Sequence, residues 1–105
     1  MVLVETHVFT RRVLTLLSDE EYTQLQLALV IRPDAGRLIP GGGGLRKLRW
    51  QAKGHGKRGG VRIIYYWAVS QERILLLYIS AKGEQDDLTP DQLKTLRQLM
   101  EAEYP

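Results

Sequence analysis

The chain has 105 residues and contains no cysteine. This absence excludes disulfides, thiolate metal sites and a cysteine nucleophile. It also fits a reducing compartment, so we expect a cytoplasmic protein. Long apolar runs are absent as well. Only Val2 to Val4 precede Glu5, which is too short for a signal peptide, and no run reaches the roughly 18 apolar residues that cross a membrane. We therefore expect no membrane partner and a single domain over residues 1–105.

Acidic residues are missing from the middle third of the chain. Between Ala35 and Gln71 there is no Asp or Glu, while eight Lys and Arg residues give this segment a charge of +8. The rest has 7 Lys and Arg against 12 Asp and Glu, a charge of −5. Such segregation predicts a surface that binds a polyanion. The alternative is a solvated cationic surface without a partner.

Apolar spacing and end signals predict three helices. The first covers about Thr6–Leu17, where apolar residues recur at helical spacing. The second begins after Ser18, which forms a capping box with Glu21, and it ends at the turn sequence RPDAG. The third begins after Thr89, a good N-cap residue that is followed by Pro90 at the first helical position.

Four short segments predict strands. They are Val2–Val4 and the sequences LRKLRWQA, VRIIYYWAV and RILLLYIS. In the second of these, Leu48 and Trp50 fall on one face, and Lys47 and Arg49 fall on the other. The order β-α-α-β-β-β-α predicts an α+β domain, a small and largely antiparallel sheet with the helices packed on one face.

One face of this predicted sheet gathers cations. If Trp50 and the apolar residues of its face lie under the helices, then Lys47, Arg49 and Arg62 share the uncovered face, with the loop KGHGKRGG at one end. Cations so close together repel one another and do not serve folding, and their natural complement is a phosphodiester chain. Tyr66, expected on the same face, would offer a stacking surface to an unpaired base.

Three sequence blocks resemble one protein family. They read GGLRKLRW, KGHGKRGGVRIIYYW and LLLYISAKGEQDDLT. Together they resemble the RelE/HigB superfamily of bacterial toxins, specifically its HigB-like branch, over almost the whole chain. The resemblance implies a fold similar to that of small microbial RNases. It also implies an endoribonuclease without metal or cofactor, an mRNA interferase that cuts mRNA on the ribosome. The implied partner is a cognate helix-turn-helix antitoxin of the HigA type.

The resemblance also selects basic residues for the site. The four expected catalytic residues are Lys47, Arg49, Arg62 and Lys82. The expected RNA contacts are Arg46, Lys53, His55, Lys57, Arg58 and Tyr66. Two positions depart from the family pattern. Gly83 stands where an arginine or asparagine is more usual, and Thr89 stands where some relatives place a tyrosine.

The chemistry of RNA cleavage assigns roles to some of these residues. RNA supplies its own nucleophile, the 2′-OH, so the protein needs a base, cations at the phosphate and a proton donor for the leaving oxygen. Arg62 is the best candidate to grip the phosphate, because its planar fork matches two phosphate oxygens. Lys47 is a candidate base if Arg49 and Arg62 favour its neutral form. His55 would suit acid-base work, although an ordinary loop role is expected for it.

Two alternatives stay open from the sequence. A non-catalytic domain that binds RNA or DNA would use the same basic face, and the departures at Gly83 and Thr89 favour it. A degenerate toxin, retained only for its complex with an antitoxin, is the other. Glu84, Asp86 and Asp87 could suggest a metal site, but nearby Lys82 and the lack of a neighbouring histidine favour a solvated turn.

Overall fold

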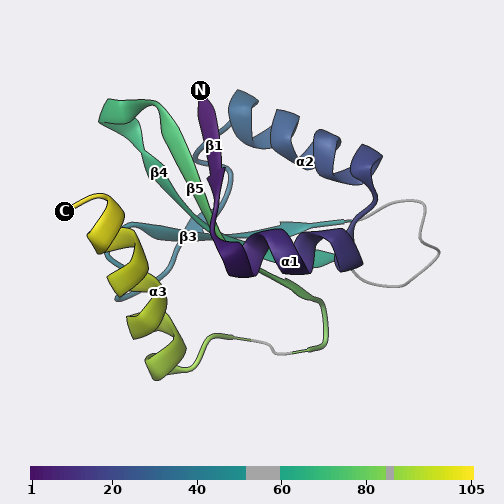
Figure 1. The fold of residues 1–105 in the computed structure, drawn as a ribbon. Coiled ribbons are helices and arrows are strands. Elements are labelled where there is room, and N and C mark those ends of the chain that lie inside the picture. The colour runs from purple at the N-terminus through teal and green to yellow at the C-terminus, as the bar shows by residue number, and fades with distance from the viewer. Residues whose placement is uncertain (52–59, 85–86) are drawn as a thin grey trace.

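A sheet of five strands forms the centre of the molecule (Figure 1). The computed structural model describes residues 1–51, 60–84 and 87–105. Its elements are β1 (Val2–Glu5), α1 (His7–Leu16), α2 (Asp19–Ile31), β2 (Arg37–Leu38), β3 (Leu45–Trp50), β4 (Val61–Ala68), β5 (Arg73–Ala81) and α3 (Pro90–Glu103). The predicted α+β class is confirmed. The two-residue strand β2 was not predicted, because alternation cannot be recognised over so short a segment.

The strands lie in the order β1-β5-β4-β3-β2. β1 pairs with β5 in parallel, and the other three pairs are antiparallel, so the sheet is largely antiparallel as predicted. β4 and β5 form a hairpin that turns at Glu72, which has a φ of 52°. β1 covers only the first half of β5, from Arg73 to Leu76. The second half of β5 is therefore free to meet a helix.

Each face of the sheet has its own apolar core. On one face α1 and α2 bury side chains such as Phe9 and Leu25 against Ile63 of β4. On the other face α3 buries Leu96 and Met100 against residues of the three central strands. The prediction that all helices pack on one face is therefore wrong for α3. β4 and β5 are apolar on both faces, so a helix must also cover the second face to remove that surface from water.

Local signals start the helices where the sequence placed them. Ser18 accepts a hydrogen bond from the backbone N–H of Glu21, whose carboxylate accepts one from Ser18 in return. Thr89 and Gln92 form the same reciprocal pair at the start of α3. Such caps contribute about 0.5–2 kcal/mol each. Thr89 thus has a structural task in this chain. Within the described ranges, no helix has the length and apolarity that crossing a membrane requires.

Side chains of α1 and its N-cap protect the open edge of β5. The Thr6 hydroxyl donates to the carbonyl of Leu77 at 2.8 Å, and Arg12 Nε donates to the carbonyl of Ile79 at 2.6 Å. The Arg12 guanidinium also lies 5.0 Å from the centre of the Tyr78 ring. Exposed strand edges invite pairing with other chains, and these contacts satisfy two of the free carbonyls instead. They also fix the end of β5, which leads directly to Lys82.

Candidate functional site

The register between β3 and β4 brings two arginines face to face. Arg49 lies directly opposite Arg62, and Lys47, two residues before Arg49, lies opposite Ile64. Residues two apart on a strand share a face, so Lys47, Arg49 and Arg62 share the α3 face. The apolar contacts of α3 involve the Leu45 end of β3. The predicted gathering of these three cations is therefore confirmed, at one end of a face that is covered only in part.

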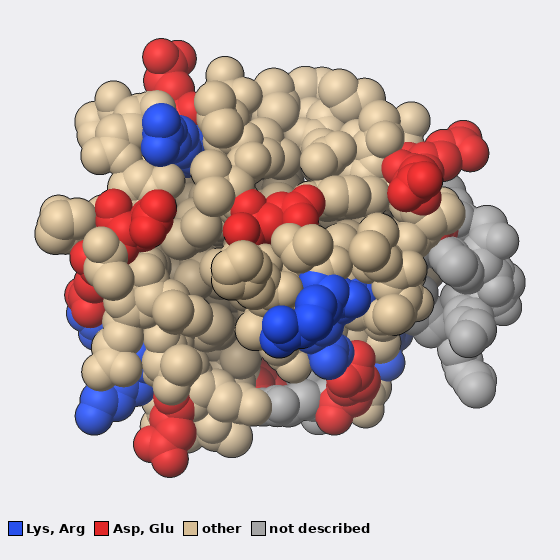
Figure 2. Space-filling model, viewed as in Figure 1, with Lys and Arg blue, Asp and Glu red and all other residues tan. Residues whose placement is uncertain are grey.

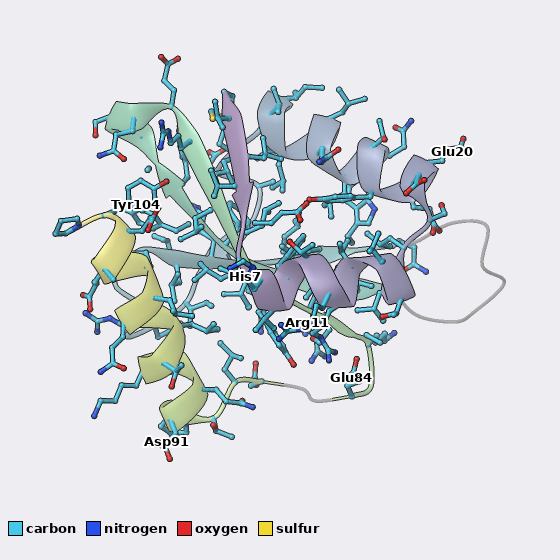
Figure 3. All side chains as sticks on the ribbon, viewed as in Figure 1. His7, Arg11, Glu20, Glu84, Asp91 and Tyr104 are labelled. Carbon is cyan, nitrogen blue, oxygen red and sulfur yellow. The ribbon has the colours of Figure 1, made fainter. Side chains whose placement is uncertain are left out.

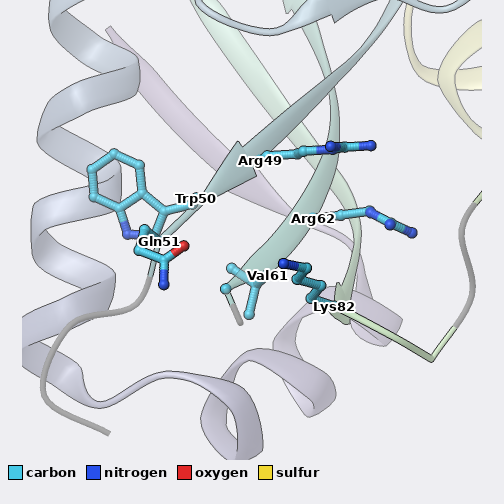
Figure 4. Close-up of a pocket in the computed structure, with 7 residues that line it drawn as sticks. Arg49, Trp50, Gln51, Val61, Arg62 and Lys82 are labelled. Atoms are coloured by element: carbon cyan, nitrogen blue, oxygen red, sulfur yellow. The ribbon is translucent and has the colours of Figure 1, made fainter. Parts of the chain in front are cut away.

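The two arginines and Lys82 line a cleft of about 180 Å³. Figure 4 shows Arg49 and Arg62 extending in the same direction from neighbouring strands, with Lys82 at the end of β5 beside them. Among the described residues, the lining is Arg49, Trp50, Gln51, Gly60, Val61, Arg62 and Lys82. Three cations therefore border one hollow from three adjacent strands or strand ends.

Arg62 is only 9% exposed, although it carries a permanent charge. Its cross-strand neighbours are Arg49 on β3 and Ser80 on β5. Like charges directly opposite each other destabilise a sheet, and an anion between them relieves this repulsion. A cleft that keeps these charges together is therefore suited to an anionic ligand. The planar guanidinium groups can each hold two oxygens of a phosphate.

Lys47 has an acidic partner from a distant part of the chain. Its Nζ donates to Asp87 Oδ1 at 2.9 Å. The hydrogen bond and charge of Lys47 lower the pKa of Asp87, and the charges of Arg62 and Arg49 lower it further. Asp87 thus lies within electrostatic reach of three of the four predicted catalytic residues. Only like-charged neighbours of Lys47 can be expected from the sequence, because its acidic partner lies 40 residues away along the chain.

A second hollow adjoins the cleft at Arg49. It has a volume of about 600 Å³, and its polar lining comes from Arg37, Lys47, Arg49 and Asp87. Arg37 lies directly opposite Lys47 in the β2–β3 pair. Sequence reasoning missed Arg37 as a site residue. The only sequence signal was its membership of the acid-free segment, because β2 is too short to show which way its residues face.

The turn that carries Lys82 is fixed from two sides. The Lys82 N–H donates to the carbonyl of Gly60 at 3.0 Å. Glu84 accepts from the Ala81 N–H at 2.8 Å and from Arg12 of α1 at 2.9 Å on both carboxylate oxygens. These contacts, the Ala81 N–H first, lower the pKa of Glu84. Figure 3 shows Glu84 beneath α1.

Gly83 occupies a backbone conformation that favours glycine. Its φ is +94°, and no heavy atom lies within 4 Å of the place where a Cβ would stand. Space is therefore available, but L side chains rarely adopt this φ. The turn geometry accounts for a glycine where the family resemblance implied a polar side chain.

Two predicted RNA contacts lie away from the cleft. Arg46 lies on the opposite face from Lys47, because neighbouring strand residues alternate, and it donates to the carbonyl of Gly36 at 2.8 Å. Tyr66 belongs to the core beneath α3, with its ring 5.7 Å from that of Tyr104. The expectation that Tyr66 stands on an uncovered face is wrong, because α3 covers that end of the sheet.

Lys53, His55, Lys57, Arg58 and Asp86 lie outside the described residues. Among the residues that are described, no three His, Asp or Glu side chains come together as metal ligands. Figure 2 shows that the side of the molecule with α1 in front has Lys and Arg interspersed with Asp and Glu. That mixed surface differs from the cleft, whose three charged lining residues are all cations.

Comparison with known proteins decides the family. A family model described as the RelE toxin of the RelE/RelB toxin–antitoxin system matches residues 7–103. The chain belongs to the RelE toxin family. This RelE-family protein is therefore a toxin of a toxin–antitoxin system by membership, and the predicted superfamily is confirmed. Its assignment to the HigB-like branch stays a prediction.

Two solved structures share the fold of this RelE-family toxin. The first is the crystal structure of the intact E. coli RelBE toxin–antitoxin complex, with a TM-score of 0.59 and 16% identity, covering 80% of this chain and 98% of that chain. The second is the isolated E. coli RelE toxin, with a TM-score of 0.55 and 12% identity, covering 93% and 97%. At such identities the likeness shows the fold alone.

Proposed function

We propose that this RelE-family toxin is a ribosome-dependent endonuclease that cuts mRNA by attack of a 2′-OH on the adjacent phosphate. The observation that carries the proposal is the direct opposition of Arg49 and Arg62 in a cleft with Lys82 at its edge. A phosphate relieves the repulsion between such opposed cations, and this pair occurs in a chain that belongs to a toxin family.

The proposed reaction needs cations and proton transfer, and RNA provides the nucleophile. A base, for which Lys47 and His55 are the candidates, takes the proton of the 2′-OH. The 2′ oxygen forms a bond to phosphorus, the bond to the 5′ oxygen breaks, and a 2′,3′-cyclic phosphate and a 5′-OH result. Arg49 and Arg62 hold the non-bridging oxygens and stabilise the charge that develops on them. Lys82 donates a proton to the leaving 5′ oxygen. These steps call for neither metal nor organic cofactor.

Lys47 fits a binding role better than the role of base in the free protein. Its Nζ already donates a hydrogen bond to Asp87, so the nitrogen that would take up the 2′-OH proton is engaged. Lys47 therefore becomes available for that task only after Asp87 has moved away. His55 stays a sequence-based candidate for acid-base work.

An antitoxin is the proposed protein partner. The chain belongs to a family defined by a toxin–antitoxin system, and the similar E. coli structure is a toxin–antitoxin complex. We keep the prediction of a helix-turn-helix antitoxin of the HigA type, encoded beside the toxin. Because the proposed substrate is mRNA on the ribosome, the proposed site of action is the cytoplasm, and residues 1–105 act as one toxin domain.

A second candidate is a domain that binds RNA without cutting it. Gly83 favours this reading, because the position offers no side chain to stabilise the transition state. Basic side chains alone support binding as well as cleavage. A degenerate toxin that serves only in its antitoxin complex would behave similarly in a cleavage assay.

Induced expression in cells tests cleavage directly. Wild type, Arg62→Gln and the control Arg11→Gln are expressed at matched levels, and growth and new mRNA 5′ ends are measured. Arg11 is an exposed arginine on α1 (Figure 3) and does not line the cleft. We expect wild type and Arg11→Gln to arrest growth and cut messages in register with the reading frame. Loss of a transition-state donor should reduce cutting about 100- to 1000-fold in Arg62→Gln.

The outcomes separate the candidates. Arg62 is buried, so a melting curve must first show that Arg62→Gln is folded. Arrest that persists in a folded Arg62→Gln protein would remove the cleft from the mechanism. If folded wild type neither arrests growth nor produces new 5′ ends, the nuclease proposal fails, and RNA binding alone is left.

A further inference from the structure

The hollow beside the cleft already holds a carboxylate. Asp87 lines it together with Arg37, Lys47 and Arg49, and its Oδ1 accepts a hydrogen bond from Lys47 at 2.9 Å. Asp87 belongs to the segment between β5 and α3, whereas the three cations come from β2 and β3. One acidic side chain from elsewhere in the fold thus enters an otherwise cationic hollow.

The cations in this hollow form a second like-charge pair. Arg37 lies directly opposite Lys47, just as Arg49 lies directly opposite Arg62 two residues farther along β3. Directly opposed residues of an antiparallel pair share a face, with Cβ atoms about 4.5–5.5 Å apart. The basic positions therefore continue across the sheet from Lys82 through Arg62, Arg49 and Lys47 to Arg37. A single phosphate in the cleft would leave the Arg37 end of this series unused.

A carboxylate is the side chain that most resembles a phosphodiester to a lysine or arginine. Both present negatively charged oxygens to N–H donors. The side chain of Asp87 is 79% exposed, whereas that of Lys47 is 26% exposed. An ion pair with one partner in water is weak and exchanges easily. Asp87 can therefore occupy the hollow in the free protein and still leave when a polyanion arrives.

We propose that Arg37 and Lys47 form a second phosphate site for the RNA, adjacent to the cleft, and that Asp87 holds this site in the free protein as an internal competitor. The inference rests on the proposed function for the identity of its ligand, a single-stranded RNA backbone. RNA that spans both hollows displaces Asp87 from Lys47. An RNA too short to reach the second site does not displace Asp87 and gains no contact with Arg37 or Lys47. Without substrate, Asp87 keeps the toxin's basic face partly neutralised.

Binding measured apart from cleavage tests this proposal. The probe is a fluorescent single-stranded RNA with every 2′-OH methylated, which removes the nucleophile and prevents cutting. Its affinity is measured by anisotropy over a series of salt concentrations. The proteins are wild type, Asp87→Asn, Arg37→Gln and Glu101→Gln. The last is a matched control, because Glu101 is also an exposed carboxylate in an ion pair, with Arg97 of α3.

Removal of the competitor should strengthen binding. We expect Asp87→Asn to bind about two- to fivefold more tightly than both wild type and Glu101→Gln, in line with the worth of an exposed ion pair. Its binding should also become more salt-dependent, because Lys47 then meets the RNA without first giving up an internal anion. Arg37→Gln should bind more weakly and lose about 0.7 from the slope of log affinity against log salt, the value for one phosphate contact in a single strand.

The possible failures are distinguishable from those of the proposed function. Equal affinities for Asp87→Asn and Glu101→Gln would overturn the role of Asp87, and an unchanged salt slope in Arg37→Gln would overturn the second site. Absence of any binding at low salt would overturn both. Wild type that binds the probe as expected but cuts no message in cells would refute the nuclease and leave this inference standing.

Discussion

The same strands form both faces of the sheet, but the two faces have different roles. The face under α1 and α2 is apolar across β4 and β5, and its one basic residue on β3, Arg46, donates to a backbone carbonyl. The face under α3 is apolar at one end only, and its other end opposes Arg49 to Arg62. On the first face, the apolar side chains of the strands are buried under α1 and α2. On the second face, two like charges oppose each other where we propose that the ligand binds.

The largest effect should come from the fully packed face. Phe9 is completely buried between α1 and the sheet, so Phe9→Ala should lower the free energy of unfolding by about 3–5 kcal/mol. Leu14 lies on the same helix and is 70% exposed, so Leu14→Ala should change it by less than about 0.5 kcal/mol. Urea unfolding of both variants measures the difference. Similar losses would mean that α1 is not held mainly by its buried side.

The two arginines of β3 should respond to substitution with opposite signs. Arg49→Gln relieves the repulsion with Arg62, so we expect the free energy of unfolding to rise by about 0.2–1 kcal/mol. Arg46→Gln removes a charged donor from the Gly36 carbonyl, so we expect a loss of about 1.5–3 kcal/mol. Thermal or urea unfolding reports both values.

RNA affinity and cleavage provide a second measurement on Arg49→Gln. Arg49→Gln should gain stability while it loses RNA affinity and cleavage, because the charge that strains the sheet is the charge that meets the phosphate. A stable Arg49→Gln protein with full activity would show that the opposed arginines are not part of the site. A destabilised one would show that Arg49 contributes to folding.

The smallest effect concerns Glu84, whose carboxylate connects Arg12 of α1 to the turn that carries Lys82. Its pKa is lowered from the ordinary value of 4.5 by the Ala81 N–H and by Arg12, so the folded protein binds the proton less readily than the unfolded chain. The carboxylate therefore adds stability above about pH 4.5, and this contribution is lost as the pH falls through the lowered folded-state pKa. Because Glu84 is largely exposed, the contribution should stay below about 1 kcal/mol.

Glu84→Gln tests this link. The variant should be less stable than wild type at neutral pH and approach wild type under acidic conditions, as followed by unfolding at several pH values. A constant difference between the two proteins at all pH values would mean that the Glu84 charge has no part in holding the turn. Glu20→Gln, an exposed carboxylate at the start of α2, serves as the control.

Much of the fold could be predicted because its signals are local. Both capping boxes lie within four residues of chain, and alternation along β3 placed Lys47 and Arg49 on one face. Spacing along β4 added Arg62 to the same face. The α+β class followed from patterns of this kind, and the family from the resemblance of three sequence blocks.

The parts that were missed depend on contacts between distant segments. The side chosen by α3 follows from the apolar surface left on the second face once α1 and α2 have covered the first. Arg37 faces Lys47 only through the register of a strand too short to recognise. Tyr66 was expected in the site and instead lies under α3. It belongs to the apolar surface of the second face, and α3 packs on that surface.

The sequence by itself determined which residues alternate, where the helices begin and which third of the chain carries the cations, because these properties depend on neighbours along the chain. Only the tertiary structure decided which cations meet across strands, that α3 covers half of their face, and that Asp87 reaches Lys47. Those outcomes depend on how the apolar side chains on both faces of β4 and β5 are removed from water, and this in turn depends on the packing of the whole domain.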